Sequence, residues 1–199
     1  LVRIFLRRRG EPSEMNESYA VDALLSAALF AADRHSDKKR KDTAKTPYIN
    51  HPLAVAEVLA RHGVDDLITL QAALLHDTIE DTETRPAELD SAFGAEVRSV
   101  VLEVTDDKQL DKAERKRLQI AKSAQLSDRA KIVKLGDMID NMTDVASKPP
   151  VGWSLERRIE YVAWTEQVVR GCRGVHEGLE EHYETALGDA REVLGVSDQ

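Results

Sequence analysis

Four side chains that can bind a divalent metal ion are spread over three stretches of this sequence. They are His51, the adjacent pair His76 and Asp77, and Asp137. Imidazole and carboxylate groups suit divalent transition metals, and a mixed set of this kind leaves coordination positions open for water or substrate. Asp137 lies in the apolar run IVKLGDMIDNM, where a buried carboxylate is costly unless it is paired or bound to a metal. We therefore expect the four residues to meet around one cation.

Two further carboxylates, Glu80 and Asp81, follow the His76-Asp77 pair. Each stands four residues after one member of that pair, so on a helix the acidic residues lie one turn along on the same edge. With a cation present, Glu80 or Asp81 can orient and deprotonate a metal-activated water. The alternative is that both are surface acids of a charged turn, and the residues alone leave the two interpretations open.

A basic run, Lys38 to Lys41, stands shortly before His51. The whole chain has a formal net charge of −8, which argues against a general nucleic-acid-binding protein because such proteins usually carry a basic face. An anionic small molecule can still bind where the local charge reverses the global sign. A basic run in isolation is usually a solvated loop, but its position beside the candidate metal residues favours an anion site here.

Helical periodicity predicts the elements that must position these residues. The chain shows no convincing alternating strand pattern, so we predict an all-α fold, a single helical bundle over residues 15–199. Ser127 and Asp128 can cap the helix that carries Asp137. The expected helices cover residues 19–32, 51–62, 67–81, 86–93, 95–104, 112–125, 131–145, 153–170 and 175–194.

Other features of the chain limit its class and location. No apolar run approaches the roughly 20 residues that cross a bilayer, so we expect no membrane partner. The single cysteine, Cys172, excludes an internal disulfide, and a cytoplasmic location follows as the default. Residues 1–14 are expected to be an upstream extension or a cloning remnant. We expect His35 to be a surface residue and residues 108–117 to form a solvated charged face.

Several ordered segments resemble the hydrolase domain of RelA/SpoT-type proteins, which belong to the HD superfamily. The likeness is to the small stand-alone alarmone hydrolases related to the metazoan SpoT homologue, and it runs from about Tyr19 to Val169. It is more specific than the His-Asp pair because it rests on several motifs in order. The segments are RKDTAKTPYINHP (Arg40–Pro52), QAALLHDTIEDT (Gln71–Thr82), FGAEV followed by LEVTDDK, and AKIVKLGDMIDN (Ala130–Asn141).

This resemblance implies a helical HD fold and a chemistry. It implies one Mn²⁺ per chain and removal of the 3′-pyrophosphate from guanosine tetra- or pentaphosphate, giving GDP or GTP. Glu80 and Asp81 match the family's acidic pair, which is thought to activate the attacking water. The implied metal ligands are His51, His76, Asp77 and Asp137.

The resemblance also implies contacts to the substrate. Arg40 and Lys41 match basic residues that line the nucleotide site, and Asn141 matches a polar residue near the ribose. Arg157 and Tyr161 match positions that approach the substrate phosphates in the metazoan branch.

The chain departs from the family pattern beside Asp137, where Gly136 and Met138 replace the more usual Ala and basic residue. The lost charge puts the affinity for substrate in doubt, whereas the implied metal set stays complete. Two alternatives remain open: a phosphatase of the same fold acting on NADPH or another nucleotide, and a nucleotide-sensing module without catalysis. A small nucleotide is the expected partner, and the sequence does not predict an oligomeric state.

Overall fold

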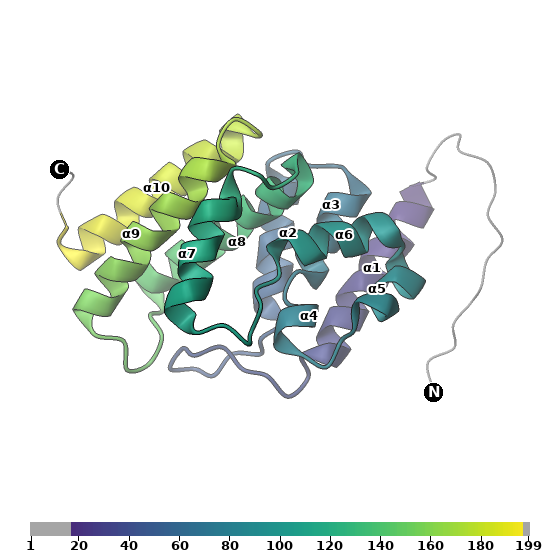
Figure 1. Cartoon of the computed structure of the whole chain (residues 1–199), viewed down its shortest axis with the longest axis horizontal. Coiled ribbons are helices and arrows are strands. Elements are labelled where there is room, and N and C mark those ends of the chain that lie inside the picture. Colours follow the sequence, from purple (N-terminus) through teal and green to yellow (C-terminus); the bar gives the residue numbers. More distant parts are fainter. Residues whose placement is uncertain (1–16, 197–199) are drawn as a thin grey trace.

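The computed structural model describes residues 17–196, and every regular element longer than an isolated bridge within that range is an α-helix (Figure 1). The predicted all-α fold is therefore confirmed, whereas the expectation for residues 1–14 lies outside the described residues. The helices are α1 (Glu17–Arg34), α2 (Asn50–Arg61), α3 (Leu67–Leu75), α4 (Thr78–Asp81), α5 (Pro86–Phe93), α6 (Ala95–Val104), α7 (Lys112–Ser123), α8 (Asp128–Ser147), α9 (Leu155–Cys172) and α10 (Glu177–Leu194).

Helix α8 holds the centre of the bundle, since it packs against α2, α3, α6, α9 and α10. Ser127 caps it as predicted, because its side chain accepts a hydrogen bond from the backbone N–H of Ala130. The side chains of Val133, Leu135, Ile139 and Met142 are buried around it. Burial of these apolar groups fixes the helix in the core and therefore fixes the height and direction of every polar group that it carries.

Gly136 lets α2 approach α8 closely. A Cβ atom at this position would lie 2.9 Å from Leu59 Cδ2 and 3.1 Å from Val55 Cγ1. The glycine costs about 1 kcal/mol of helix propensity relative to alanine. The close approach accounts for the glycine at this position, because side chains of α2, the helix that carries His51, occupy the space that an alanine methyl group would fill.

The predicted helix over residues 67–81 is wrong in one respect, because the chain breaks it at His76 and Asp77 into α3 and α4. Two side chains take carbonyls at the end of α3: His76 Nδ1 lies 2.8 Å from Ala73 O, and Thr78 Oγ1 donates to Leu75 O at 2.6 Å. Such side-chain donors compete with the backbone N–H groups that would continue the helix. Because of this break, the directions of the His76 and Asp77 side chains are not fixed by the 100° step between neighbours on a regular helix.

The segment between α1 and α2 is an ordered loop that lies against the core. An isolated antiparallel bridge joins Lys39 to Pro47, and Asp42 accepts hydrogen bonds from the backbone N–H and the hydroxyl of Thr46. His35, at the start of this loop, is buried with 2% exposure, so the expected surface position is wrong. Its ring centroid lies 4.8 Å from that of Tyr48, which covers it.

No helix among the described residues is long and apolar enough to cross a bilayer.

Candidate active site

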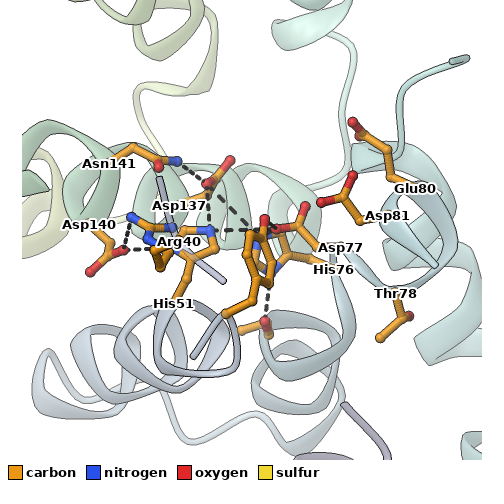
Figure 2. Close-up of polar contacts among 12 residues, drawn as sticks. Arg40, His51, His76, Asp77, Thr78, Glu80, Asp81, Asp137, Asp140 and Asn141 are labelled. Atoms are coloured by element: carbon orange, nitrogen blue, oxygen red, sulfur yellow. Dashed lines mark hydrogen bonds and ion pairs between the residues drawn. The ribbon is translucent and has the colours of Figure 1, made fainter. Parts of the chain in front are cut away.

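The four predicted metal residues converge at one place, although they come from three parts of the chain (Figure 2). His51 lies in the first turn of α2, His76 and Asp77 at the break between α3 and α4, and Asp137 in α8. His51 Nε2 is 3.3 Å from Asp137 Oδ1 and 3.7 Å from Asp77 Oδ2. His76 Nε2 is 3.2 Å from Asp77 Oδ2 and 3.9 Å from Asp137 Oδ1.

Both imidazole rings point Nε2 at these carboxylates, and in the neutral ring with a proton on Nδ1 this atom carries the lone pair. The Nδ1 atom of His76 donates to the Ala73 carbonyl, and the Nδ1 atom of His51 donates to Asp140 Oδ2 at 2.6 Å. Among residues 17–196, the buried His76 Nε2 finds no hydrogen-bond partner. Lone pairs of neutral imidazoles and carboxylate oxygens repel one another at such distances unless a cation or protons lie between them. The donor set therefore fits a divalent metal ion.

The electrostatics of the site favour positive charge. Burial alone would lower the pKa of His51, but Asp137, Asp140 and Asp77 outweigh it and raise that pKa to about 9. The pKa of His76 is also raised, against burial, by Asp77 and Asp137. A group of buried carboxylates that draws protons onto two imidazoles offers the same negative field to a metal ion.

Three further side chains hold the two carboxylates in place. The hydroxyl of Tyr48 donates to Asp77 Oδ2 at 2.6 Å. Lys134 Nζ donates to Asp137 Oδ2 at 3.1 Å, and Asn141 Nδ2 donates to Asp137 Oδ1 at 2.5 Å. Because Lys134 occupies Oδ2, it is Oδ1 of Asp137 that faces the two histidines. Asn141 thus lies against a candidate metal ligand, at a position where the sequence predicted a contact to the ribose.

The acidic pair lies at the Asp77 end of the site (Figure 2). Glu80 Oε2 accepts from the backbone N–H of Asp106 at 3.0 Å. Lys108 Nζ bridges the pair, at 3.1 Å from Glu80 Oε1 and 2.7 Å from Asp81 Oδ1. Burial raises the pKa of Glu80, and the nearby Asp77 and Asp106 carboxylates add to this effect. A raised pKa brings Glu80 closer to the value that suits a proton acceptor near neutral pH.

Lys108 and Arg115 correct the prediction that residues 108–117 are only a solvated charged face. Lys108 binds both members of the acidic pair, and Arg115 Nη1 lies 3.7 Å from both Glu80 Oε1 and Asp106 Oδ2. No sequence pattern joins these residues to Glu80, because the contact arises only when the segment before α7 folds back over α4.

A second part of the site collects positive charge. Burial lowers the pKa of Lys112, and the nearby Arg157, Lys41 and Arg115 lower it further. The guanidinium carbon of Arg157 lies 4.5 Å from the centre of the Trp153 ring. The structure thus brings Lys41 and Arg157, both predicted from sequence, to Lys112, which was not predicted. A group of neighbouring cations of this kind gives the surface a local positive potential, which favours anions.

Tyr161 lies beside this cationic group. Its ring packs against Trp153 and Trp164, with centroid distances of 5.3 and 5.2 Å. Burial raises the pKa of its hydroxyl, and the Asp137 carboxylate raises it further. Tyr161 therefore shares the Trp153 ring with Arg157 of the cationic group, and its hydroxyl lies within the electrostatic influence of Asp137.

Arg40 is occupied by acids of α8 and does not stand free. Its Nη2 atom lies 2.5 Å from Asp144 Oδ2 and 3.4 Å from Asp140 Oδ2. The sequence predicted Arg40 as a nucleotide contact and did not predict Asp140 or Asp144. Their spacing, three and seven residues after Asp137, places them on the same face of α8 and is the signal that could have found them.

Comparisons with known proteins agree with this geometry. Residues 27–162 match the family model described as HD domain. The human guanosine-3′,5′-bis(diphosphate) 3′-pyrophosphohydrolase MESH1 is 52% identical over 159 residues, which cover 79% of this chain and 89% of the human protein. The Drosophila melanogaster MESH1 protein is 42% identical over 164 residues, which cover 82% of this chain and 92% of that protein.

A solved structure shares the fold. It is described as a metazoan orthologue of SpoT that hydrolyses ppGpp, and it superimposes with a TM-score of 0.81 at 41% sequence identity, covering 83% of this chain and 94% of that chain. The family model spans well over half of the chain, and the chain covers most of the length of these relatives. The chain therefore belongs to the HD domain family and, within it, to the group of proteins related to MESH1.

Proposed function

We propose that this protein is a Mn²⁺-dependent hydrolase that removes the 3′-pyrophosphate from guanosine tetra- or pentaphosphate, giving GDP or GTP. The relatives reported above carry the name of this activity. The observation that supports it best is the pair of Nε2 atoms, of His51 and His76, that face the carboxylates of Asp77 and Asp137. The proposed ligands of the Mn²⁺ are therefore His51, His76, Asp77 and Asp137.

Mn²⁺ held there supplies Lewis-acid chemistry, which lowers the pKa of a water ligand and polarises a phosphoryl oxygen. Glu80 and Asp81 are the proposed proton acceptors for that water, and the raised pKa of Glu80 suits this role. Lys108 contacts both carboxylates, and its positive charge favours their ionised forms, which are the forms that accept a proton.

The cationic group binds the polyphosphate in this proposal. Lys41, Lys112 and Arg157 repel one another in the absence of an anion, and phosphate charge removes that repulsion. Arg40, Asn141 and Tyr161 complete the proposed substrate contacts on the side of α8 and α9. A planar guanidinium can pair with two phosphate oxygens, whereas each lysine supplies a point charge.

We also propose a cytoplasmic location. The single cysteine, Cys172, is a buried free thiol. A protein without a disulfide gains nothing from an oxidising compartment.

The test is a hydrolysis assay on purified protein that is stripped of metal and then resupplied with Mn²⁺. Guanosine tetraphosphate and NADPH are assayed in parallel, with release of pyrophosphate and of phosphate as the respective readouts. We expect turnover of guanosine tetraphosphate that depends on Mn²⁺. Turnover of NADPH alone would replace this substrate with the other nucleotide, and turnover of neither would leave a nucleotide-sensing module.

Substitution of the acidic pair tests the proposed proton acceptors. Glu80→Gln and Asp81→Asn keep the size of each side chain and remove its basicity, so we expect the rate to fall by about 100-fold or more in at least one variant. Unchanged hydrolysis in both variants would remove these two residues from the mechanism. Glu83→Gln is the matched control, because Glu83 is an exposed acid just beyond α4 and its substitution should leave the rate unchanged.

A further inference from the structure

The Nδ1 atoms of the two candidate ligand histidines are held by different kinds of acceptor. His76 donates to the carbonyl of Ala73, a neutral group in the last turn of α3. His51 donates to the carboxylate of Asp140, which comes from α8. A distance of 2.6 Å between Nδ1 and a carboxylate oxygen requires a proton on Nδ1. This proton leaves Nε2 of the neutral ring as the lone pair that a metal ion needs.

Asp140 stands one turn after Asp137 on α8, so one helix supplies both a candidate metal ligand and the acceptor that orients another ligand. The side chain of His51 is only 2% exposed, so no solvent can replace this acceptor. A carboxylate in this position makes the imidazole a stronger donor of electron density and adds negative charge near the cation. The neutral carbonyl that accepts from His76 adds no net charge near the cation and increases the electron donation of its imidazole much less.

Asp140 is also tied to the loop that covers the site. Arg40 Nη2 lies between Asp140 and Asp144, the second of which lies one further turn along α8. The guanidinium offsets the charge of both acids, and only 13% of its side chain is exposed. Arg40 thus links a loop predicted to line the nucleotide site to the acceptor of a metal-binding histidine.

We infer that Asp140 is a positioning residue of this protein: it fixes the tautomer and the ring of His51 for metal binding and, through Arg40, joins the nucleotide loop to the metal site. Among the described residues, Asp144 shares the contact to Arg40 but makes no contact to His51. This inference rests on the proposed function for its metal, and a metal titration tests it without reference to any substrate.

The experiment measures the affinity of metal-free protein for Mn²⁺ by the electron paramagnetic resonance signal of the free ion. Asp140→Asn removes the charge and keeps an oxygen that can accept from Nδ1, whereas Asp140→Ala removes both. We expect Mn²⁺ affinity to fall by about tenfold in the first variant and by about 100-fold in the second. Asp144→Asn, the matched control, should bind Mn²⁺ within about twofold of the unsubstituted protein, since it leaves His51 untouched.

Two results would overturn the inference. One is Mn²⁺ binding by Asp140→Ala within the same twofold range. The other is an equal loss in Asp140→Asn and Asp144→Asn, which would reduce the role of Asp140 to general negative charge. Circular dichroism of the metal-free variants checks that each is folded, and Asp140→Asn alone decides the matter if Asp140→Ala is not.

A kinetic measurement then separates this inference from the proposed function. With guanosine tetraphosphate as substrate, Asp140→Asn should raise the Mn²⁺ concentration needed for half the maximal rate more than it raises the KM for the nucleotide. Asp144→Asn should do the reverse. The Mn²⁺ affinities of the unsubstituted protein and its variants can follow the predicted order even if the unsubstituted protein hydrolyses neither nucleotide. In that case the proposed function fails and the role of Asp140 stands.

Discussion

The imidazole of His35 lies beneath Tyr48, whose hydroxyl holds Asp77 in the candidate metal site. Neither ring nitrogen of His35 has a hydrogen-bond partner in the part of the chain that the structure describes. Burial lowers the pKa of His35 below its ordinary value of 6.5, and the positive charge of Lys38 lowers it further, whereas Asp77 and Asp81 oppose the shift. His35 therefore packs in the core as a neutral aromatic ring, and protonation of that ring would place an unpaired charge in the core.

This arrangement predicts a pH dependence of stability. The folded protein binds the proton of His35 less readily than the unfolded chain, so the contribution of His35 is fully present above about pH 6.5 and is lost as the pH falls toward the lower folded value. His35→Phe keeps a ring against Tyr48 and cannot be protonated. We expect urea denaturation to show that the unsubstituted protein loses more stability than His35→Phe between about pH 8 and about pH 5.

Comparison at both pH values with the same metal content serves as the control, because any loss of metal on acidification affects both proteins. Parallel stability profiles would show that His35 takes up its proton as readily in the folded protein as in the unfolded chain.

At the scale of residues, the candidate metal ligands could be predicted from the sequence, whereas the side chains that hydrogen-bond to the site carboxylates could not. His51, His76, Asp77 and Asp137 stand out by residue type and apolar context. Tyr48, Lys134 and Lys108 do not, because a tyrosine or lysine has many uses and its partner is decided by folding. The contact between Lys108 and Glu80, for instance, joins residues 28 positions apart along the chain with no shared periodicity.

At the scale of elements, α7 and α9 pack so closely that a glycine is required. A Cβ atom on Gly171 would lie 2.0 Å from Ser123 Oγ and 2.8 Å from the backbone nitrogen of Ala124. Relief of that overlap requires the end of α7 to move, since one of the two atoms belongs to the backbone. The contact matters for the site because α7 carries Lys112 and α9 carries Arg157 and Tyr161.

Gly171→Ala should therefore destabilise the fold by about 1–3 kcal/mol, the usual cost of overpacking. Gly188→Ala is the matched control, because Gly188 lies within α10 and a Cβ atom there meets no atom of the described residues within 4 Å. Alanine should stabilise that helix by about 0.5–1 kcal/mol. Denaturant midpoints measure both changes, and a stabilising effect of Gly171→Ala would contradict the close packing described here.

The helices themselves were predictable because each has an apolar face of helical period. The predicted spans 86–93 and 95–104 agree with α5 and α6, since Pro86 and Gly94 mark their ends. The break at His76 and Asp77 was not predictable from periodicity, because the apolar pattern continues to the turn and hydrogen bonds from two side chains end α3.

At the scale of the whole molecule, the proposed metal ion joins three parts of the bundle: α2, the break between α3 and α4, and α8. An ion that binds the folded state alone stabilises it by about 2.7 kcal/mol when its free concentration is 100 times its Kd. For a chain of this size that corresponds to a rise in Tm of roughly 5–10 °C. Removal of metal should lower the Tm by the same amount.

Thermal unfolding with and without a chelator, followed by readdition of Mn²⁺, measures this effect. Asp137→Asn should show a Tm that does not respond to Mn²⁺. A Tm of the unsubstituted protein that is equally indifferent to chelator and to Mn²⁺ would speak against a metal ion at this place.

The order of the candidate ligands along the chain has a consequence for how the protein is made. His51, His76 and Asp77 leave the ribosome well before Asp137, and α3, which packs against α1, α2 and α6, gains its remaining contact with α8 only after α8 has been synthesised. The nascent chain thus holds an incomplete set of donors during most of its synthesis. With the proposed ligand set, a chain truncated before α8 would lack both the helix at the centre of the bundle and the Asp137 ligand, so metal binding would follow the synthesis of α8.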